Sequence, residues 1–278
     1  MNKLNTIFII SKGRPQSKTA NMLNKINYKG DWFICVQEDE EHLEEYKNNF
    51  GEKKIITYNY YEEIPHTDFL DNFSNENRNC GVVVVRNIIP KIAKNYGCER
   101  YWIFDDDITN IRYYNFKIGK WRKFTGEQLE KTLNNITHYA NNCNIAKIGF
   151  FPTNGGFPPN PYLQSTNVIQ IMNMPVDLPK FKGRVSEDDI HNFILAKYSY
   201  IFFVISWITF SSEDYNVNKS GGGLNDLYQE IGSSLRASYI LIYHPTMKIE
   251  LKKNKIIHHT KMTLNTPKLI SEHYKKGE

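Results

Sequence analysis

Cysteine is scarce in this sequence, and its placement argues against a zinc ribbon. The four cysteines of the 278-residue chain stand far apart, so no two have the spacing of paired metal ligands. Scattered thiols in a chain of this size are typical of a reducing compartment. They are Cys35, Cys80, Cys98 and Cys143.

Long hydrophobic runs are also missing. The longest one, residues 200–210, is about half the length of a membrane-spanning helix and has the character of a buried strand. The apolar residues 7–10 are too few for the core of a signal peptide. We therefore expect a cytoplasmic protein with no membrane partner, and we infer no obligate protein partner.

Several catalytic motifs are absent. The sequence contains no Walker motif, no dinucleotide-binding glycine fingerprint and no nucleophile elbow. Their absence disfavours an NTPase, a dehydrogenase and a serine hydrolase. The charge excludes less, because a net charge of +5 permits a polyanionic partner without requiring one.

The order of predicted elements favours an α/β fold. Strand-like apolar runs at 6–11, 32–36 and 54–58 alternate with helical spacing at 19–26 and 42–50. This alternation predicts βαβ units and a mostly parallel central sheet flanked by helices. Since no linker divides the chain, we expect one domain over residues 1–278.

Further elements are expected along the rest of the chain. Helical spacing over 86–96 places Pro90 in the first turn of a helix, where proline is tolerated. Strands are expected at 101–104, 146–150, 168–172 and 200–210, and a last strand at 255–259 should close the core. Helices are expected at 127–139 and 190–198.

The strongest functional signal is the acidic end of a buried strand. Residues 101–104 are apolar and run directly into Asp105, Asp106 and Asp107. In open α/β sheets ligands bind beyond the carboxyl ends of the strands. Alternate residues of an extended segment point the same way, so Asp105 and Asp107 can share one face. Carboxylates in this arrangement suit Mg²⁺ or Mn²⁺ together with substrate phosphates.

A second acidic cluster comes directly before a predicted helix. Glu187, Asp188 and Asp189 follow Ser186. Acidic residues in a first helical turn are ordinary complements of the helix dipole. With two acidic clusters in one α/β domain, however, one can hold a metal while the other supplies a general base.

Two weaker signals complete the set. His258 and His259 follow the last predicted strand, and imidazole is a good ligand for Mn²⁺. Lys12 and Arg14 flank a glycine at the end of the first strand, where Arg14 can bind a phosphate with two hydrogen bonds.

Taken in order, these residues resemble a nucleotide-sugar glycosyltransferase of the GT-A fold, which is Rossmann-like and carries a smaller acceptor-side sheet. Residues 101–107 look like the segment that leads to the Asp-x-Asp motif of that family. The resemblance implies a donor half at about 1–110 and an acceptor half at about 111–278. It assigns the metal to Asp105 and Asp107, with Asp106 able to replace either, and its third ligand to His258 or His259. It assigns the donor to Ser11, Lys12, Arg14, Gln37, Glu38, Arg86, Asn87, Asp105 and Asp106.

The same resemblance assigns the general base of an inverting enzyme to the pair Glu187 and Asp188. Because this chain has Glu-Asp-Asp, the base is Asp188 or Asp189, and Asp188 is preferred as the acid that follows Glu. The implied reaction moves a sugar from a UDP-sugar to an acceptor hydroxyl with Mn²⁺ or Mg²⁺.

The Ser-Lys-Gly-Arg-Pro opening and the Asp-Asp-Asp-Ile segment are similar to a narrower group, the phage TET-associated glycosyltransferases. That resemblance implies 5-hydroxymethylcytosine in phage DNA as the acceptor. The proline- and aromatic-rich residues 150–162 would then receive the base, and Lys117, Lys120, Arg122 and Lys123 would meet phosphates. The acceptor residues expected there are Phe151, Asn154, Gly155, Phe157 and Tyr162.

Three alternatives stay open at this point. The first is the same fold acting on a glycan, a protein or another acceptor that is not DNA. The second is a DNA-binding module that has lost catalysis, and the third is a metal-dependent nuclease or phosphotransferase that uses residues 105–107.

Overall fold

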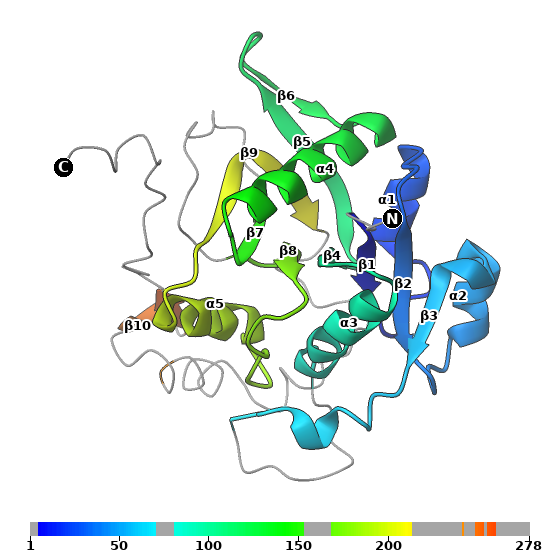
Figure 1. Cartoon of the computed structure of the whole chain (residues 1–278), viewed down its shortest axis with the longest axis vertical. Coiled ribbons are helices and arrows are strands. Elements are labelled where there is room, and N and C mark those ends of the chain that lie inside the picture. The colour runs from blue at the N-terminus through cyan, green and yellow to red at the C-terminus, as the bar shows by residue number, and fades with distance from the viewer. Residues whose placement is uncertain are drawn as a thin grey trace.

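A computed structural model shows an α/β architecture with a large central sheet between helices (Figure 1). It describes residues 5–70, 81–152, 168–212 and 241, and the backbone of two strands at 248–252 and 255–259. The strands are β1 Ile7–Ile10, β2 Trp32–Gln37, β3 Ile55–Tyr58, β4 Arg100–Asp105, β5 Ile108–Asn115, β6 Lys120–Lys123, β7 Lys147–Pro152, β8 Ile171–Pro175, β9 Phe202–Ser212, β10 Lys248–Lys252 and β11 Lys255–His259. The helices are α1 Lys18–Lys25, α2 Leu43–Phe50, α3 Val83–Asn95, α4 Gly126–Asn142 and α5 Glu187–Lys197, with 3-10 turns at Glu52–Lys54 and Ile64–His66.

Nine strands form one mixed sheet in the order β3-β2-β1-β4-β8-β7-β9-β5-β6. The first four strands are mutually parallel, as the βαβ pattern predicts, so their carboxyl ends meet at one edge. The remaining strands pair antiparallel except for β7 and β9, which run parallel. The α/β prediction is therefore confirmed, with the parallel part confined to the first half of the sheet. The expected donor half, about 1–110, and the expected acceptor half, about 111–278, both contribute strands to this one sheet.

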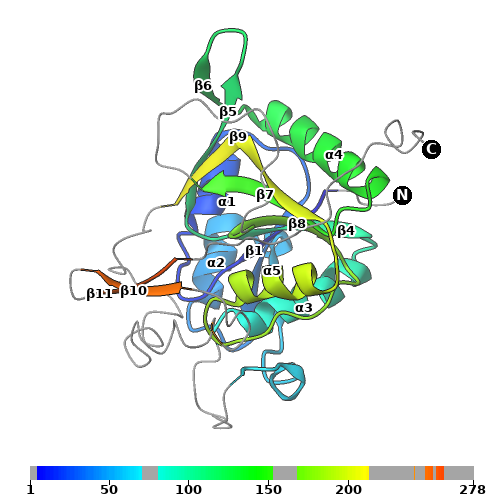
Figure 2. The same cartoon turned by 90° about the vertical axis from the view of Figure 1, so that its left-hand side faces the viewer.

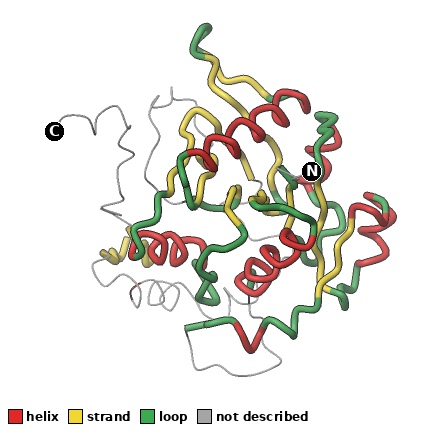
Figure 3. Tube along the Cα trace, in the orientation of Figure 1, coloured by secondary structure: helices red, strands yellow, loops and turns green. Residues whose placement is uncertain are grey.

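Helices cover both faces of the sheet (Figures 2 and 3). In β1, Ile7 and Ile9 pack in one buried cluster while Phe8 and Ile10 pack in the other, because successive side chains point to opposite faces. Helices α1, α2 and α4 contribute to the first cluster, and α3 and α5 contribute to the second. A strand covered on both faces reads as an unbroken apolar run, which explains why β1 is visible in the sequence.

Helix α3 starts earlier than the sequence predicts. It begins at Val83, so Pro90 lies in the interior of the helix and not in its first turn. Three consecutive valines, Val83 to Val85, are β-branched and favour a strand by propensity, but all three are buried in the helical conformation. Tertiary burial thus outweighs local preference here.

Two further elements differ from the prediction. The last strand, β11, pairs only with β10 in a separate two-stranded sheet, so it does not extend the nine-stranded sheet. The hairpin formed by β5 and β6 was not predicted at all. In the part of the chain that is described, no helix is both long and apolar enough to cross a membrane.

Candidate active site

Two segments meet at the carboxyl edge of the sheet. One is the loop between β1 and α1, residues 11–17, called the first loop, and the other is the acidic turn, Asp105 to Asp107. Strands β1 and β4 are parallel neighbours with Ile10 opposite Asp105, so Ser11 and Asp106 emerge side by side. Strand β2 lies on the other side of β1 and brings Gln37 to the same edge, where it is buried. This is the position at which α/β sheets bind ligands.

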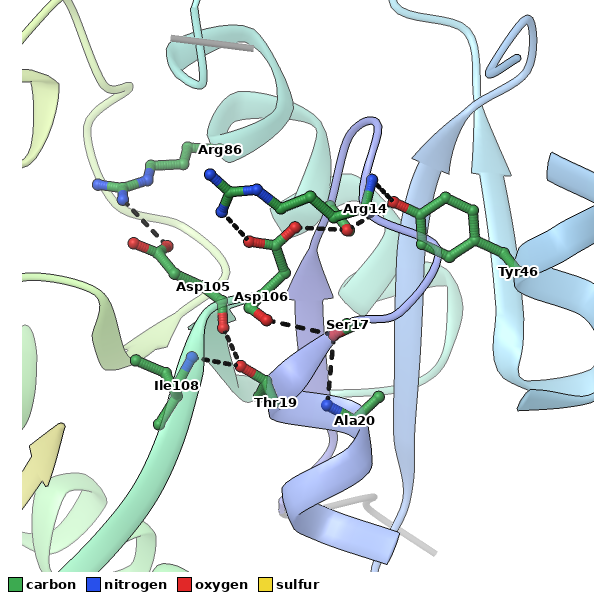
Figure 4. Close-up of polar contacts among 10 residues, drawn as sticks. Arg14, Ser17, Thr19, Ala20, Tyr46, Arg86, Asp105, Asp106 and Ile108 are labelled. Carbon is green, nitrogen blue, oxygen red and sulfur yellow. Dashed lines mark hydrogen bonds and ion pairs between the residues drawn. The ribbon is translucent and has the colours of Figure 1, made fainter. Parts of the chain in front are cut away.

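The start of α1 fixes the backbone of the acidic turn (Figure 4). The Thr19 hydroxyl donates to the carbonyl oxygen of Asp105 and accepts from the backbone N–H of Ile108 at 2.9 Å. The backbone N–H of Thr19 and the hydroxyl of Ser17 both donate to the carbonyl oxygen of Asp106, at 3.1 and 3.4 Å. Ser17 also accepts from Ala20 and so caps α1. Ser17 and Thr19 were not predicted from the sequence, although a serine directly before helical spacing is a cap signal.

Asp106 binds the first loop and faces a different arginine from Asp105 (Figure 4). Its carboxylate accepts hydrogen bonds from the Ser11 hydroxyl and from Arg14 Nη1, at 2.5 and 2.9 Å. Tyr46 supports the same loop, because its hydroxyl accepts from the backbone N–H of Arg14 at 2.9 Å and bonds Ser11 at 2.7 Å. Burial raises the pKa of Asp106, and the contacts with Arg14 and Ser11 oppose that rise. The middle aspartate is therefore a fixed support of the loop that carries Lys12 and Arg14.

We predict that Asp106→Asn weakens binding of a nucleotide donor and lowers the free energy of unfolding by about 1.5–3 kcal/mol, the usual contribution of a hydrogen bond to a charged group. The amide keeps the shape of the carboxylate but removes the charge that holds Arg14. Donor titration and urea unfolding measure the two effects. Asp177→Asn, at an exposed carboxylate in a long 3.9 Å ion pair, is the matched control. An Asp106→Asn protein that binds donor like this control would contradict the supporting role.

Arg86 connects the two acidic clusters. Its guanidinium, with only 2% of the side chain exposed, lies 3.4 Å from Asp105, 2.9 Å from Glu187 and 3.9 Å from Asp188. Asp105 ends β4, Arg86 lies in the first turns of α3, and the other two begin α5. Three elements distant in sequence thus meet at one buried cation. Glu187 is nearly inaccessible at 5%, whereas Asp188 keeps 19% of its side chain exposed, so Asp188 is the one that a substrate can reach.

The charge balance at this centre suits a divalent cation. Burial raises the pKa of Asp105 to about 8; Arg86 opposes the rise, and Asp107, Asp188 and Asp106 add to it. A cation beside Asp105 and Asp107 would keep both carboxylates ionised, and oxygen ligands are those that Mg²⁺ and Mn²⁺ prefer. Among the described residues no three His, Cys, Asp or Glu side chains form a metal-binding group. Two carboxylates with substrate phosphates fit the magnesium pattern, in which protein supplies few ligands.

Buried polar side chains hold the segment that leads into α5. Asn87 donates to the carbonyl oxygen of Phe181 at 3.0 Å and accepts from the Phe181 N–H at 2.8 Å, which fixes the segment before the helix. His191, which is completely buried, stacks on Phe181 and hydrogen bonds the Pro179 carbonyl oxygen at 2.9 Å. Asn87 thus holds the backbone that leads to Asp188.

Lys147 is a second buried cation under the same helix. It is completely inaccessible, and its Nζ donates to Asn192 Oδ1 at 2.9 Å. Burial lowers the pKa of Lys147 from 10.5 to about 7, against the attraction of Asp188. Lys147, His191 and Asn192 were not predicted from the sequence, because nothing in the local pattern distinguishes a buried polar side chain from an exposed one.

We predict that Lys147→Met stabilises the protein at pH 7 and that this advantage shrinks as the pH rises. Between pH 7 and about 10.5 the unfolded chain keeps the lysine proton while the folded chain has lost it. In this range the free energy of unfolding of the wild type therefore rises with pH, by up to about 1.4 kcal/mol per pH unit from this group. Below pH 7 the cost of the buried charge is fully present. Urea unfolding at pH 7, 8 and 9 tests this, with the exposed Lys197→Met as control. A difference between wild type and Lys147→Met that does not change with pH would contradict it.

The remaining predicted residues lie as follows. Lys12 and Glu38 are exposed at the carboxyl edge, and Phe151 is half-buried against the second core cluster. Asp107 and Asp189 are half-buried. Asn154, Gly155, Phe157 and Tyr162 lie outside the described residues. His258 and His259 end β11, and their side chains lie outside the description as well.

Comparison with known families decides the affiliation of the chain. Residues 5–210 match the family described as TET-Associated Glycosyltransferase. The chain belongs to this family. The match includes both acidic clusters, Arg86 and the first loop, and it confirms the resemblance drawn from the sequence. Membership makes the chain a glycosyltransferase. No curated protein matches the sequence.

Proposed function

We propose that this glycosyltransferase moves a sugar from a UDP-sugar to the hydroxyl of 5-hydroxymethylcytosine in DNA, in a reaction that depends on a divalent metal. The observation that carries the proposal is that Asp105, Glu187 and Asp188 all surround Arg86. Asp105, a proposed metal ligand beside the donor phosphates, thus lies near Asp188, the proposed base. The family name supports glycosyl transfer, and the modified DNA base is what the resemblance drawn from the sequence implies.

Each side chain has a defined part in this proposal. Asp105 and Asp107 would hold Mn²⁺ or Mg²⁺, which neutralises charge on a leaving diphosphate. Lys12 and Arg14, on the loop that Asp106 supports, bind donor phosphates, and Gln37 and Glu38 meet the nucleoside. Asp188 takes the proton of the acceptor hydroxyl. The oxygen of that hydroxyl forms a bond to the anomeric carbon as the bond from this carbon to the diphosphate breaks, which inverts the anomeric centre.

A base in duplex DNA cannot reach such a site while it is stacked. It has to leave the helix, as it does in other enzymes that act on bases, and aromatic side chains then stack on it. Phe151, Phe157 and Tyr162, with Asn154 and Gly155, are proposed as that receiving surface. The second candidate function is the same transfer to a glycan, a protein or another acceptor, which needs no such surface.

The donor half of the proposal is tested without any acceptor. UDP with Mn²⁺ or Mg²⁺ should raise the thermal unfolding midpoint, and a UDP-sugar should be hydrolysed slowly to UDP. Asp107→Ala should abolish both effects. A protein that cleaves DNA with metal alone, and that neither binds nor hydrolyses a UDP-sugar, would instead be a nuclease.

A further inference from the structure

The β5–β6 hairpin projects from the body of the protein. Figures 1 and 2 show its tip beyond all other described elements, at the end of the sheet opposite β3. The first part of β5 pairs with β9 up to Tyr113, and the residues that follow pair only with β6. The Asn115 side chain accepts from the Lys117 N–H at 3.0 Å, and Gly119 takes a positive φ of 62°, so the tip has a defined turn.

All charges on this hairpin have one sign. Between Ile108 and Lys123 there are five cations and no acidic residue. Four of them are exposed, and none of these four forms an ion pair with another described residue: Lys117, Lys120, Arg122 and Lys123. Because these cations face solvent and the hairpin itself carries no acidic residue, it presents a concentrated positive charge to a polyanion.

One face of the hairpin is also aromatic. Tyr114 lies opposite Trp121 in the ladder, and their rings contact at 5.3 Å between centroids. Phe116 packs edge-on against Tyr114 at 5.1 Å and keeps 55% of its surface exposed, and Ile118 keeps 47%. Lysines on an edge strand often block the addition of another strand. That role would explain the lysines of the hairpin, but it does not explain the exposed apolar side chains at its tip.

The hairpin starts at the catalytic centre. Strand β5 begins at the residue after Asp107, and Asn115 at its far end lies eight residues further on. At about 3.4 Å per residue, Asn115 stands at most roughly 27 Å from the acidic turn, and the turn at the tip lies beyond it. Duplex DNA rises about 3.4 Å per base pair, so the end of β5 stands at most about eight base pairs from the reacting base.

We propose that the β5–β6 hairpin is a DNA-binding arm that lies in a groove of the duplex within about eight base pairs of the target base, with its cations on phosphates. A two-stranded β-ribbon fits the major groove of B-DNA. The assignment of DNA as the partner rests on the proposed function, and the binding itself requires neither donor nor metal. The arm contributes affinity independent of sequence, because phosphate contacts carry no sequence information.

The test is binding of fluorescent duplex DNA by anisotropy, without donor or metal, between 50 and 200 mM salt. The arm variant carries Lys117→Gln, Lys120→Gln, Arg122→Gln and Lys123→Gln. The control variant loses four exposed cations on other elements, through Lys25→Gln, Lys53→Gln, Lys94→Gln and Lys197→Gln. Four lost phosphate contacts should flatten the slope of log affinity against log salt by roughly 3–4 and weaken binding at low salt at least tenfold, while the control changes little. Equal thermal unfolding midpoints verify that both variants are folded.

A second measurement tests the reach. Wild-type affinity should fall when the duplex on both sides of a central 5-hydroxymethylcytosine is shortened from twelve to four base pairs, and the arm variant should show no such fall. Two results would overturn the proposal that the hairpin binds DNA. One is an equal salt slope in the arm and control variants, and the other is a wild-type protein that does not bind DNA. A wild type that binds DNA through the hairpin but transfers no sugar would keep the arm and reject the proposed reaction instead.

Discussion

Replacement of Asp188 by Asn should lower turnover by about 10²–10⁴-fold while donor affinity stays nearly unchanged. This is the usual contribution of a general base, which an amide cannot replace because it does not accept the proton. The structure favours Asp188 over Glu187 because Glu187 is buried in its ion pair with Arg86, whereas Asp188 remains partly exposed. One Asp188 oxygen accepts from the N–H of Asp189 at 2.9 Å, which fixes the orientation of the carboxylate.

The comparison variants are Asp189→Asn and Asp177→Asn. Asp189→Asn tests the neighbouring acid of the cluster, and Asp177→Asn tests an exposed aspartate outside the site. We expect both to keep most of their turnover, measured as single-turnover sugar transfer at saturating donor. An Asp188→Asn protein that retains half its turnover, or a larger loss in Asp189→Asn, would move the base to another residue.

Replacement of Arg86 by Met should be the most destabilising single change near the site. It leaves the buried Glu187 without its 2.9 Å partner and removes the cation beside Asp105. Breaking a buried ion pair on one side typically costs about 3–5 kcal/mol. Displacement of α5 should also reduce turnover of the folded protein by about 10²-fold, since small misplacements of a catalytic group have effects of this size.

Arg100→Met is the matched control for Arg86→Met. Arg100 is also buried, at 4% exposure, but lies at the opposite end of β4, where it donates to Asn173 and to the carbonyl oxygen of Ile145. Urea unfolding should show a loss of stability in both variants, and turnover per folded molecule should fall only for Arg86→Met. The double variant Arg86→Met, Glu187→Met should regain part of the stability. Equal turnover in the two single variants would show that Arg86 acts on folding alone.

The parts of this site that the sequence predicts are those written into short segments. Strand β4 is an apolar run that ends in carboxylates, and the acids of α5 come directly before a helical pattern, so both clusters are visible without a structure. The parallel arrangement of β1 and β4 brings the first loop to Asp105, as the βαβ pattern implies. The donor residues, the metal ligands and the base stay predictions, because no described contact includes a substrate.

Other parts depend on contacts between distant segments. Asp106 and Asp105 are adjacent and chemically identical, yet one supports the first loop and the other faces Arg86, a difference set by α1 and α3. The hairpin was missed although residues 114–118 alternate apolar and polar side chains and a turn glycine follows at position 119, so its signal was present in the local sequence. The burial of Lys147 depends on α5, which begins 40 residues further along the chain, so it leaves no signature in the sequence around Lys147.

The most direct measurement is the intact mass of an oligonucleotide that contains 5-hydroxymethylcytosine, after incubation with the protein, Mn²⁺ or Mg²⁺ and a mixture of UDP-sugars. The account predicts a mass gain equal to one hexose, pentose or N-acetylhexosamine, and no gain with Asp107→Ala. Release of UDP without a mass gain would keep the donor chemistry and move the acceptor away from DNA. Neither a mass gain nor release of UDP would contradict the proposed reaction and its catalytic assignments.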